Sequence, residues 1–149
     1  MAVKDTSRKP YIVDNDSNVK VGIDLPIRRD DTKGGWFATT STTIEAVKNN
    51  IRNLLNTNQG ERLMQPALGL NLKNILFEQI DDETILNVQD SILDIMKLWL
   101  PFVEVRDIQI ETNNRGNEVR VNIIFNIVQD PNTLDSVTIN FSSDINDNN

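Results

Sequence analysis

The hydrophobic period of the chain changes once along its length, at Pro101. Before this proline, apolar residues recur at steps of three and four, which is the spacing of one face of an α-helix. After it, apolar and polar residues alternate, as they do in a strand with one buried face. Helices followed by strands predict an α+β fold, with two main helices packed on one face of an antiparallel sheet.

The helical part contains signals for where each main helix begins and ends. Thr42 and Glu45 have the spacing of a capping box, and Gly60 is the expected left-handed residue after the last turn. The second helix is predicted to start near Asp82 and to end before Pro101, because the residue before a proline avoids helical geometry. Between the helices we expect an extended piece over residues 61–64, a turn bounded by Pro66 and Gly69, and a short helix containing Leu72, Ile75, Leu76 and Phe77.

Three strands are predicted after Pro101, in the order of a simple antiparallel meander. The alternation slips at Arg106-Asp107, which indicates a β-bulge. A turn is expected over residues 130–132, and the first and third strands should form the edges of the sheet. The third has no Lys, Arg or Pro to block strand addition, so either another chain or a segment such as the N-terminal arm pairs with it. This strand comprises Val137, Thr138, Ile139, Asn140 and Phe141.

The patterns divide the chain into three parts. Residues 1–40 lack sustained periodicity and are broken by Pro10, Pro26 and Gly34-Gly35, so we expect an extended N-terminal arm. Residues 41–142 carry the helices and the meander, and residues 143–149 form a loose polar tail. The arm is either a segment that gains order against a partner or a frayed terminus.

Composition excludes several kinds of chemistry. The 149 residues include neither cysteine nor histidine, which excludes disulfides, thiol catalysis, serine–histidine triads and almost every structural zinc site. The net charge of −7 disfavours nucleic acid as a partner. No stretch is apolar enough to cross a bilayer and no signal peptide begins the chain, so we expect a soluble protein made in a cytoplasm.

Two arrangements of carboxylates are candidate sites. Residues 14–18 begin like a calcium loop, but Val19 and Leu25 occupy the positions that require a glycine and a bidentate glutamate. Glu61 and Glu78 could form the carboxylate pair of a retaining glycosidase, which needs carboxyls about 5–5.5 Å apart. No sequence feature supplies the apolar cleft that raises the pKa of the catalytic acid. The sequence therefore favours a protein that is not an enzyme and needs no metal or cofactor.

One block of the sequence resembles a known family motif. The block resembles the pattern "GER…P.FG…L…LFE" of the baseplate wedge, or sheath-initiator, family of contractile phage tails. This family has a domain labelled lysozyme-like, and related subunits occur in type VI secretion baseplates and phage-derived injection particles. The likeness extends over about residues 22–142. The matching residues are Gly60, Glu61, Arg62, Pro66, Gly69, Leu76, Phe77 and Glu78.

The resemblance implies a structural role in the tail baseplate of a virion. The motif residues would build the fold, and the strand 137–141 would pair with strands of the tail sheath protein. Other implied partners are wedge proteins and tube or hub proteins, in six-fold copies. The family usually carries Glu-Pro-Arg after the second helix, where this chain has Leu100, Pro101 and Phe102, so docking to wedge proteins there would be hydrophobic.

Two alternatives stay open on the sequence alone. One is a peptidoglycan hydrolase that uses Glu61 and Glu78, consistent with the lysozyme-like label. The other is the equivalent baseplate subunit of a type VI secretion system or of an injection particle.

Overall fold

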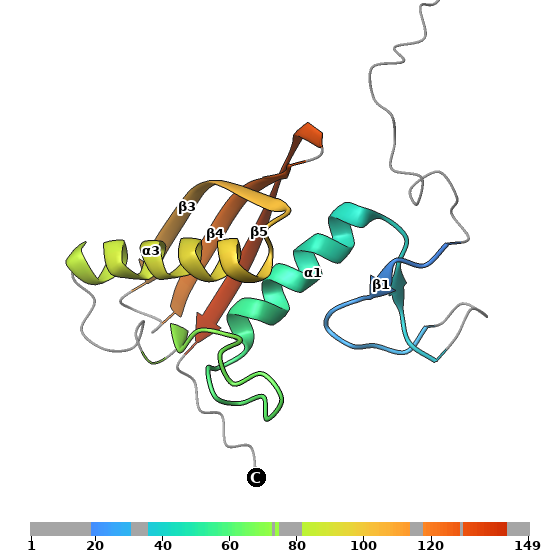
Figure 1. Cartoon of the computed structure of the whole chain (residues 1–149), viewed down its shortest axis with the longest axis horizontal. Helices are drawn as coiled ribbons and strands as arrows, with labels where there is room; N and C mark the ends of the chain where they lie inside the picture. The colour runs from blue at the N-terminus through green and yellow to red at the C-terminus, as the bar shows by residue number, and fades with distance from the viewer. Residues whose placement is uncertain are drawn as a thin grey trace, which may run out of the picture. The chain divides into compact units, whose positions relative to one another are not determined.

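The computed structural model describes residues 19–30, 36–72, 74, 82–113, 118–128 and 130–142. The chain divides into two units, Met1–Asn50 and Ile51–Asn149, and the boundary falls within helix α1 (Thr43–Asn56) (Figure 1). Each unit is described separately below.

The first unit contains a small antiparallel pairing that the sequence did not predict. Strand β1 (Gly22–Ile23) pairs with β2 (Thr39–Thr40), within the segment expected to be an extended arm. The pairing continues beyond β1, because Ala38 donates its N–H to the carbonyl of Arg28 at 2.9 Å. The sequence reasoning missed β1 although Val19, Val21, Ile23 and Leu25 are spaced two apart around it, whereas β2 has only two residues and shows no such spacing.

The start of α1 follows the predicted cap. The N–H of Glu45 donates to the Thr42 hydroxyl oxygen at 3.4 Å, which satisfies one of the free donors at the beginning of the helix. Thr42 therefore lies at the N-cap position, as the spacing predicted.

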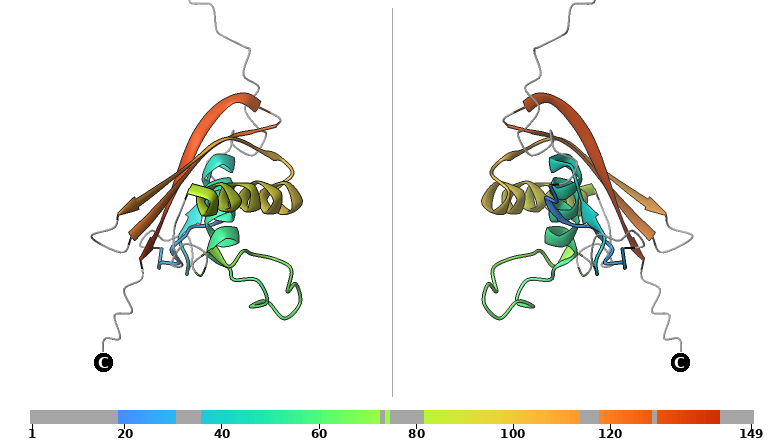
Figure 2. Two further views of the ribbon diagram at one scale, coloured as in Figure 1. Left: turned by 90° about the vertical axis from the view of Figure 1, so that its left-hand side faces the viewer. Right: turned by 90° about the vertical axis from the view of Figure 1, so that its right-hand side faces the viewer.

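The second unit contains the three-stranded meander. Strands β3 (Val103–Asn113), β4 (Glu118–Ile127) and β5 (Asp130–Ser142) are antiparallel in the order β3-β4-β5, which confirms the predicted topology and its two edges. The register shifts between Val105 and Asp107, at the predicted bulge. Helix α3 (Asp82–Trp99) lies against one face of the sheet (Figures 1 and 2), and its bounds match the prediction.

The core of the second unit forms where the apolar stripe of α3 meets the alternating apolar residues of the sheet. Each large aliphatic or aromatic side chain fully buried in this way contributes about 1.5–3 kcal/mol to the free energy of unfolding. The opposite face of the sheet is polar. The fully buried side chains include Val88, Ile92 and Met96 of α3, Val121, Ile123 and Phe125 of β4, and Val137 and Phe141 of β5.

The turn predicted over residues 130–132 is wrong. Strand β5 begins at Asp130, which pairs with Ile127, so only two residues connect β4 to β5. A two-residue connection is a common hairpin geometry. Pro131 thus lies near the start of β5, where an edge strand tolerates a proline, and the strand is free of proline from Asn132 onward.

The extended piece predicted over residues 61–64 is also wrong. These residues form reverse turns, and the N–H of Gln65 donates to the Arg62 carbonyl at 3.2 Å. Gly60 has the expected positive φ, +88°, but α1 ends at Asn56, so the glycine belongs to the loop and not to the helix cap.

Several predicted features lie outside the described residues. They are the calcium-like run at 14–18, most of the short helix with Leu72, Ile75, Leu76 and Phe77, the motif residue Glu78 and the tail 143–149. Within the described part of the chain, none of the helices has the length and hydropathy that a membrane span requires.

Candidate functional site

The outer edge of β5 is the first candidate surface. No strand pairs with this edge in the described part of the chain. Val137, Ile139 and Phe141 point their side chains into the core, whereas Thr138 and Asn140 are exposed on the polar face. The Thr138 hydroxyl donates to the Asn122 side chain at 3.2 Å, and Arg120 donates to the Asn140 side chain at 3.3 Å. The side chains of β5 are therefore committed to its own sheet, and the backbone remains for a partner.

The direction of the backbone groups follows from a hydrogen bond beside β4. Val128 donates its N–H to the Phe102 carbonyl at 3.0 Å, on the side of β3. Successive residues of a strand direct their N–H and C=O groups to opposite sides, so Asn122 bonds toward β3 and Val121 toward β5. Thr138 is opposite Asn122, and its own N–H and C=O groups therefore point away from the sheet. The same geometry holds for Asn140, opposite Arg120.

The outer edge of β3 differs from that of β5. By the same alternation, the Ile108 carbonyl points away from β4, and it accepts a hydrogen bond from the Gln89 amide of α3 at 2.8 Å. The bulge next to it breaks the regular spacing that an added strand would need. β5 has its own register shift, between Asp130 and Asp135, and pairs with β4 without a shift from Asp135 to Ser142. The two edges therefore differ chiefly in the Ile108 carbonyl of β3, which is already bonded to Gln89.

A polar network fixes the β3 bulge in place. The Arg106 guanidinium donates to Asn126 at 2.6 Å, the Asn126 amide donates to Glu104 at 3.1 Å, and Arg106 pairs with Glu104 at 3.0 Å. Asn126 is fully buried. The sequence reasoning missed this residue, although a polar residue between the large apolar residues of β4 was the signal that could have indicated it.

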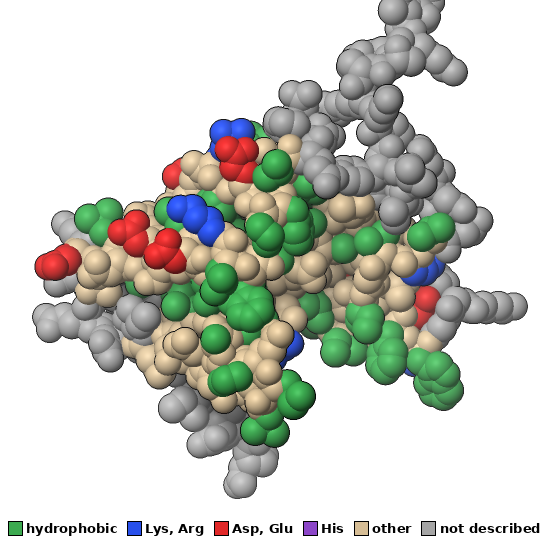
Figure 3. Space-filling model, viewed as in Figure 1, with side chains coloured by type: hydrophobic (Ala, Val, Ile, Leu, Met, Phe, Trp, Pro, Cys, Tyr) green, Lys and Arg blue, Asp and Glu red, His purple; other side chains and the backbone are tan. Residues whose placement is uncertain are grey.

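The predicted wedge-docking residues lie at the end of α3. Leu100 is buried, and its N–H donates to the Met96 carbonyl at 2.7 Å, whereas Pro101 and Phe102 are exposed. Leu98 in the last turn of α3 and Val128, which is hydrogen-bonded to Phe102, are also exposed. The sequence reasoning missed these two, although Leu98 is an apolar residue outside the stripe of the helix. By contrast, acidic residues gather along the solvent side of α3 (Figure 3), among them Glu83, Asp90 and Asp94.

The family-motif residues that the structure describes close a loop after α1. Gly60 donates its N–H to the Pro66 carbonyl at 2.8 Å, and Arg62 donates to the Asn53 side chain at 3.2 Å. At Gly69, with φ +102°, an added Cβ would lie 2.2 Å from the Thr57 carbonyl oxygen. Only a glycine therefore fits against Thr57 at this position.

The geometry around Glu61 does not favour hydrolysis. Glu61 is exposed, and its carboxylate accepts the backbone N–H of Asn58 at 3.0 Å. The general acid of a glycosidase usually lies in an apolar cleft, whereas Glu61 is exposed. Glu78 is outside the described residues. Across the part of the chain that the structure describes, no three His, Cys, Asp or Glu residues are grouped to hold a metal ion.

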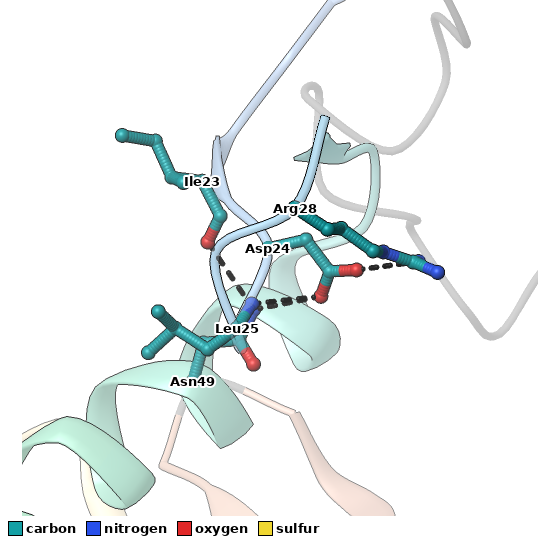
Figure 4. A network of polar contacts seen from close by, with 5 residues as sticks. All are labelled: Ile23, Asp24, Leu25, Arg28 and Asn49. Carbon is teal, nitrogen blue, oxygen red and sulfur yellow. Dashed lines mark hydrogen bonds and ion pairs between the residues drawn. The ribbon is translucent and has the colours of Figure 1, made fainter. Parts of the chain in front are cut away.

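In the first unit, Asp24 is the centre of a polar network (Figure 4). Its carboxylate accepts hydrogen bonds from Arg28 at 2.7 Å, from the Asn49 amide at 3.3 Å and from the N–H of Leu25 at 3.0 Å. The hydrogen bond from Arg28, followed by that from Asn49, holds the pKa of Asp24 below its ordinary value. Asn49 also donates to the Ile23 carbonyl at 3.3 Å, so this network ties β1 to the middle of α1.

Solved structures and one protein family are similar to this chain. Comparison with curated proteins gives no match. Among solved structures, the chain resembles one from Geobacter sulfurreducens described as a candidate tail lysozyme, with 22% identity and a TM-score of 0.61 over 69% of this chain and 93% of that one. It also resembles a chain in the baseplate of the anti-feeding prophage, with 24% identity and a TM-score of 0.60 over 71% of this chain and 83% of that one.

At these identities, the two structures establish the shared fold. The family model described as baseplate wedge protein gp25 matches residues 41–132, which is more than half of the chain and runs from just before α1 into the start of β5. The chain belongs to the gp25 family of baseplate wedge proteins.

Proposed function

We propose that this baseplate subunit of a contractile injection system initiates the sheath by accepting a strand of the sheath protein along the outer edge of β5. The observation that carries the proposal is the inequality of the two sheet edges. The edge of β5 is unpaired within the described residues and pairs with β4 without a shift over Asp135–Ser142, whereas in β3 the Ile108 carbonyl, next to the bulge, is bonded to Gln89. Strands add to regular edges and are blocked by bulges and covered edges.

The added strand would bond to the outward N–H and C=O groups of Thr138 and Asn140. Its apolar side chains would lie on the same face as Val137, Ile139 and Phe141 and would extend the buried surface. A shift of one residue would expose every apolar side chain of the added strand, so burial of these side chains excludes such a shift. Main-chain bonds thus supply the affinity and alternate side chains set the register. A growing sheath would start from this fixed template.

The exposed residues at the end of α3 suit a second contact. In the proposal, Pro101 and Phe102, together with Leu98 and Val128, bind other wedge proteins through apolar surface, while Leu100 supports them from the core. The subunit would then lie near the tail tube or hub in six copies, after synthesis in a host cytoplasm. The division into an arm (1–40), a wedge domain (41–142) and a tail (143–149) is part of the same proposal.

The test is a pull-down with the sheath protein from the same genome, using two proline variants. Thr138→Pro removes an outward donor on β5 and leaves the ladder with β4 intact. Thr112→Pro makes the same change on the outer side of β3, where Thr112 is opposite Val119. We expect sheath binding to fall at least about tenfold for Thr138→Pro and to stay unchanged for Thr112→Pro, with circular dichroism confirming that both fold. Equal binding by Thr138→Pro and the unaltered chain would contradict strand addition at this edge.

A further inference from the structure

The polar face of the β3-β4-β5 sheet carries two rows of side chains that cross the strands and end at the outer edge of β5. The first row ends at Thr138, and the second ends at Asn140. Both side chains are exposed and are bonded to their own sheet, and each keeps one hydrogen-bonding group for a partner. The direction of the hydrogen bonds in each row determines whether that group is a donor or an acceptor.

In the first row, every hydrogen bond runs in the same direction. A carboxylate has no proton to donate, so the Gln109 amide NH2 faces Asp107, to which it donates at 2.9 Å. The Gln109 side-chain oxygen then faces Asn122, whose amide N–H donates to it at 3.5 Å. The Asn122 side-chain oxygen in turn accepts the Thr138 hydroxyl proton at 3.2 Å. Since a hydroxyl has one proton, the Thr138 oxygen can only accept a further hydrogen bond.

The second row has the opposite direction. A guanidinium has only donors, so the atom of Asn140 that Arg120 approaches at 3.3 Å is the amide oxygen. Arg120 also pairs with Glu111 of β3 at 3.7 Å, which keeps the guanidinium in the row. The Asn140 NH2 group therefore lies on the side away from Arg120, and no hydrogen bond among the described residues uses it. At this position the edge offers a donor.

We propose that the sheath strand added at β5 carries a hydrogen-bond donor opposite Thr138 and a hydrogen-bond acceptor opposite Asn140. This inference rests on the proposed function, because it describes the strand that the β5 edge accepts. Residues two apart on a strand point to the same face of a sheet, so both side chains of the added strand would meet the polar rows. The residue between them would lie on the buried face, beside Ile139.

The two rows distinguish registers that the apolar face does not. A shift of the added strand by two residues keeps its apolar side chains on the buried face. The same shift brings its donor opposite the Asn140 donor, or its acceptor opposite the Thr138 acceptor. The rows also select against particular side chains, namely Asp and Glu opposite Thr138 and Lys and Arg opposite Asn140.

The first test measures the affinity of the full chain for the sheath protein from the same genome. Thr138→Val keeps the branched shape and removes the hydroxyl, whereas Thr138→Ser keeps the hydroxyl. We expect Thr138→Val to weaken binding about two- to fivefold, and Thr138→Ser to bind more tightly than Thr138→Val. Thr112→Val, the same change on β3, should have no effect. Equal affinities of the two Thr138 variants would overturn the acceptor role of Thr138.

The second test reverses the group that Asn140 offers. Asn140→Asp keeps an oxygen for Arg120 and replaces the outward NH2 by a second oxygen, so two acceptors would lie opposite each other. We expect this variant to bind the sheath protein at least about threefold more weakly. Asn87→Asp adds the same charge at an exposed position of α3 and is the control. Unchanged or tighter binding by Asn140→Asp would overturn the donor role of Asn140.

The third test identifies the opposite residues directly. The chain has no cysteine, so Thr138→Cys and Asn140→Cys each introduce a single thiol. Disulfide formation with single-cysteine variants of the sheath protein reports which sheath position lies opposite each thiol, because the bond requires close Cβ atoms. We expect the natural sheath residue to be a donor opposite Thr138 and an acceptor opposite Asn140. An apolar residue at either position, Asp or Glu opposite Thr138, or Lys or Arg opposite Asn140 would overturn the proposal.

The outcomes separate this inference from the proposed function. Thr138→Pro tests strand addition itself, because it removes an outward backbone donor. If Thr138→Pro loses binding while Thr138→Val and Asn140→Asp bind like the unaltered chain, the rows do not select the strand and the proposed function stands. If Thr138→Pro binds like the unaltered chain, both proposals fail. Circular dichroism confirms that each variant is folded.

Discussion

At the scale of single residues, Gly69 has no room for a side chain. Its φ is +102°, and an added Cβ would lie 2.2 Å from the Thr57 carbonyl oxygen. Gly60 has a φ of +88°, but a Cβ added there would have no other atom within 4 Å. Gly60→Ala should therefore lower the free energy of unfolding by about 1 kcal/mol through backbone strain alone. Gly69→Ala adds a backbone clash and should cost at least about 3 kcal/mol. Urea unfolding measures both, and equal losses would contradict the described packing of the loop.

Asp24 gives a pH dependence with a definite sign. Because its pKa is lowered in the folded chain, its contribution to stability is present above the ordinary aspartate pKa of about 3.9 and is lost as the pH falls through the lowered value. Asp24→Asn should therefore be less stable than the unaltered chain at pH 7 and equally stable at pH 2. Thermal unfolding at several pH values tests this, with Asp94→Asn as a control for the loss of one exposed negative charge.

The residues that sequence reasoning missed are those whose role depends on distant partners. Asn126 is a polar residue between large apolar residues of β4, but only the fold shows that Arg106 and Glu104 are its partners. The pattern around Leu63 and Met64 predicts an extended piece, because it contains no signal for the turns that the bonds to Asn58 and Pro66 hold. Polar partners and loop closure are long-range properties, whereas hydrophobic period is a local one.

At the scale of elements, α3 contacts the outer edge of β3 through the Gln89 side chain. Gln89 donates to the Ile108 carbonyl, which faces away from the sheet. Gln89→Ala should lower the free energy of unfolding by about 1 kcal/mol, since the carbonyl loses its partner. Asp90→Ala, at an exposed neighbouring position on the same helix, should change it by less than about 0.5 kcal/mol. Chemical unfolding checks this, and a neutral Gln89→Ala would mean that α3 does not cover this edge.

Element types were easier to predict than element bounds. The bulge and the end of α3 followed from a break in alternation and from Pro101, which are both local signals. The start of β5 did not, because Asp130 and Pro131 suggest a turn, while the actual turn is set by pairing of Ile127 with Asp130. The pairing partner decides where a hairpin turns, and one strand alone does not contain that information.

At the scale of the whole molecule, the change of period at Pro101 was sufficient to predict the α+β class and the meander. It could not show which edge of the sheet is open. That difference arises from the hydrogen bond of Gln89 to the Ile108 carbonyl of β3, since β5 pairs with β4 without a shift from Asp135 to Ser142 and has no strand on its outer side within the described residues. The fold class could therefore be predicted from the sequence, whereas the proposed function rests on a difference between the two edges that only the structure reveals.

The most direct measurement of the central claim is amide hydrogen exchange with and without the sheath protein. Strand addition at β5 should slow exchange at Thr138 and Asn140, whose N–H groups point away from β4, by at least about a hundredfold at saturating sheath protein. Exchange at Ile110 and Thr112, on the outer side of β3, should stay unchanged. Protection of the β3 amides, or no protection at Thr138 and Asn140 despite sheath binding, would contradict initiation of the sheath at the β5 edge.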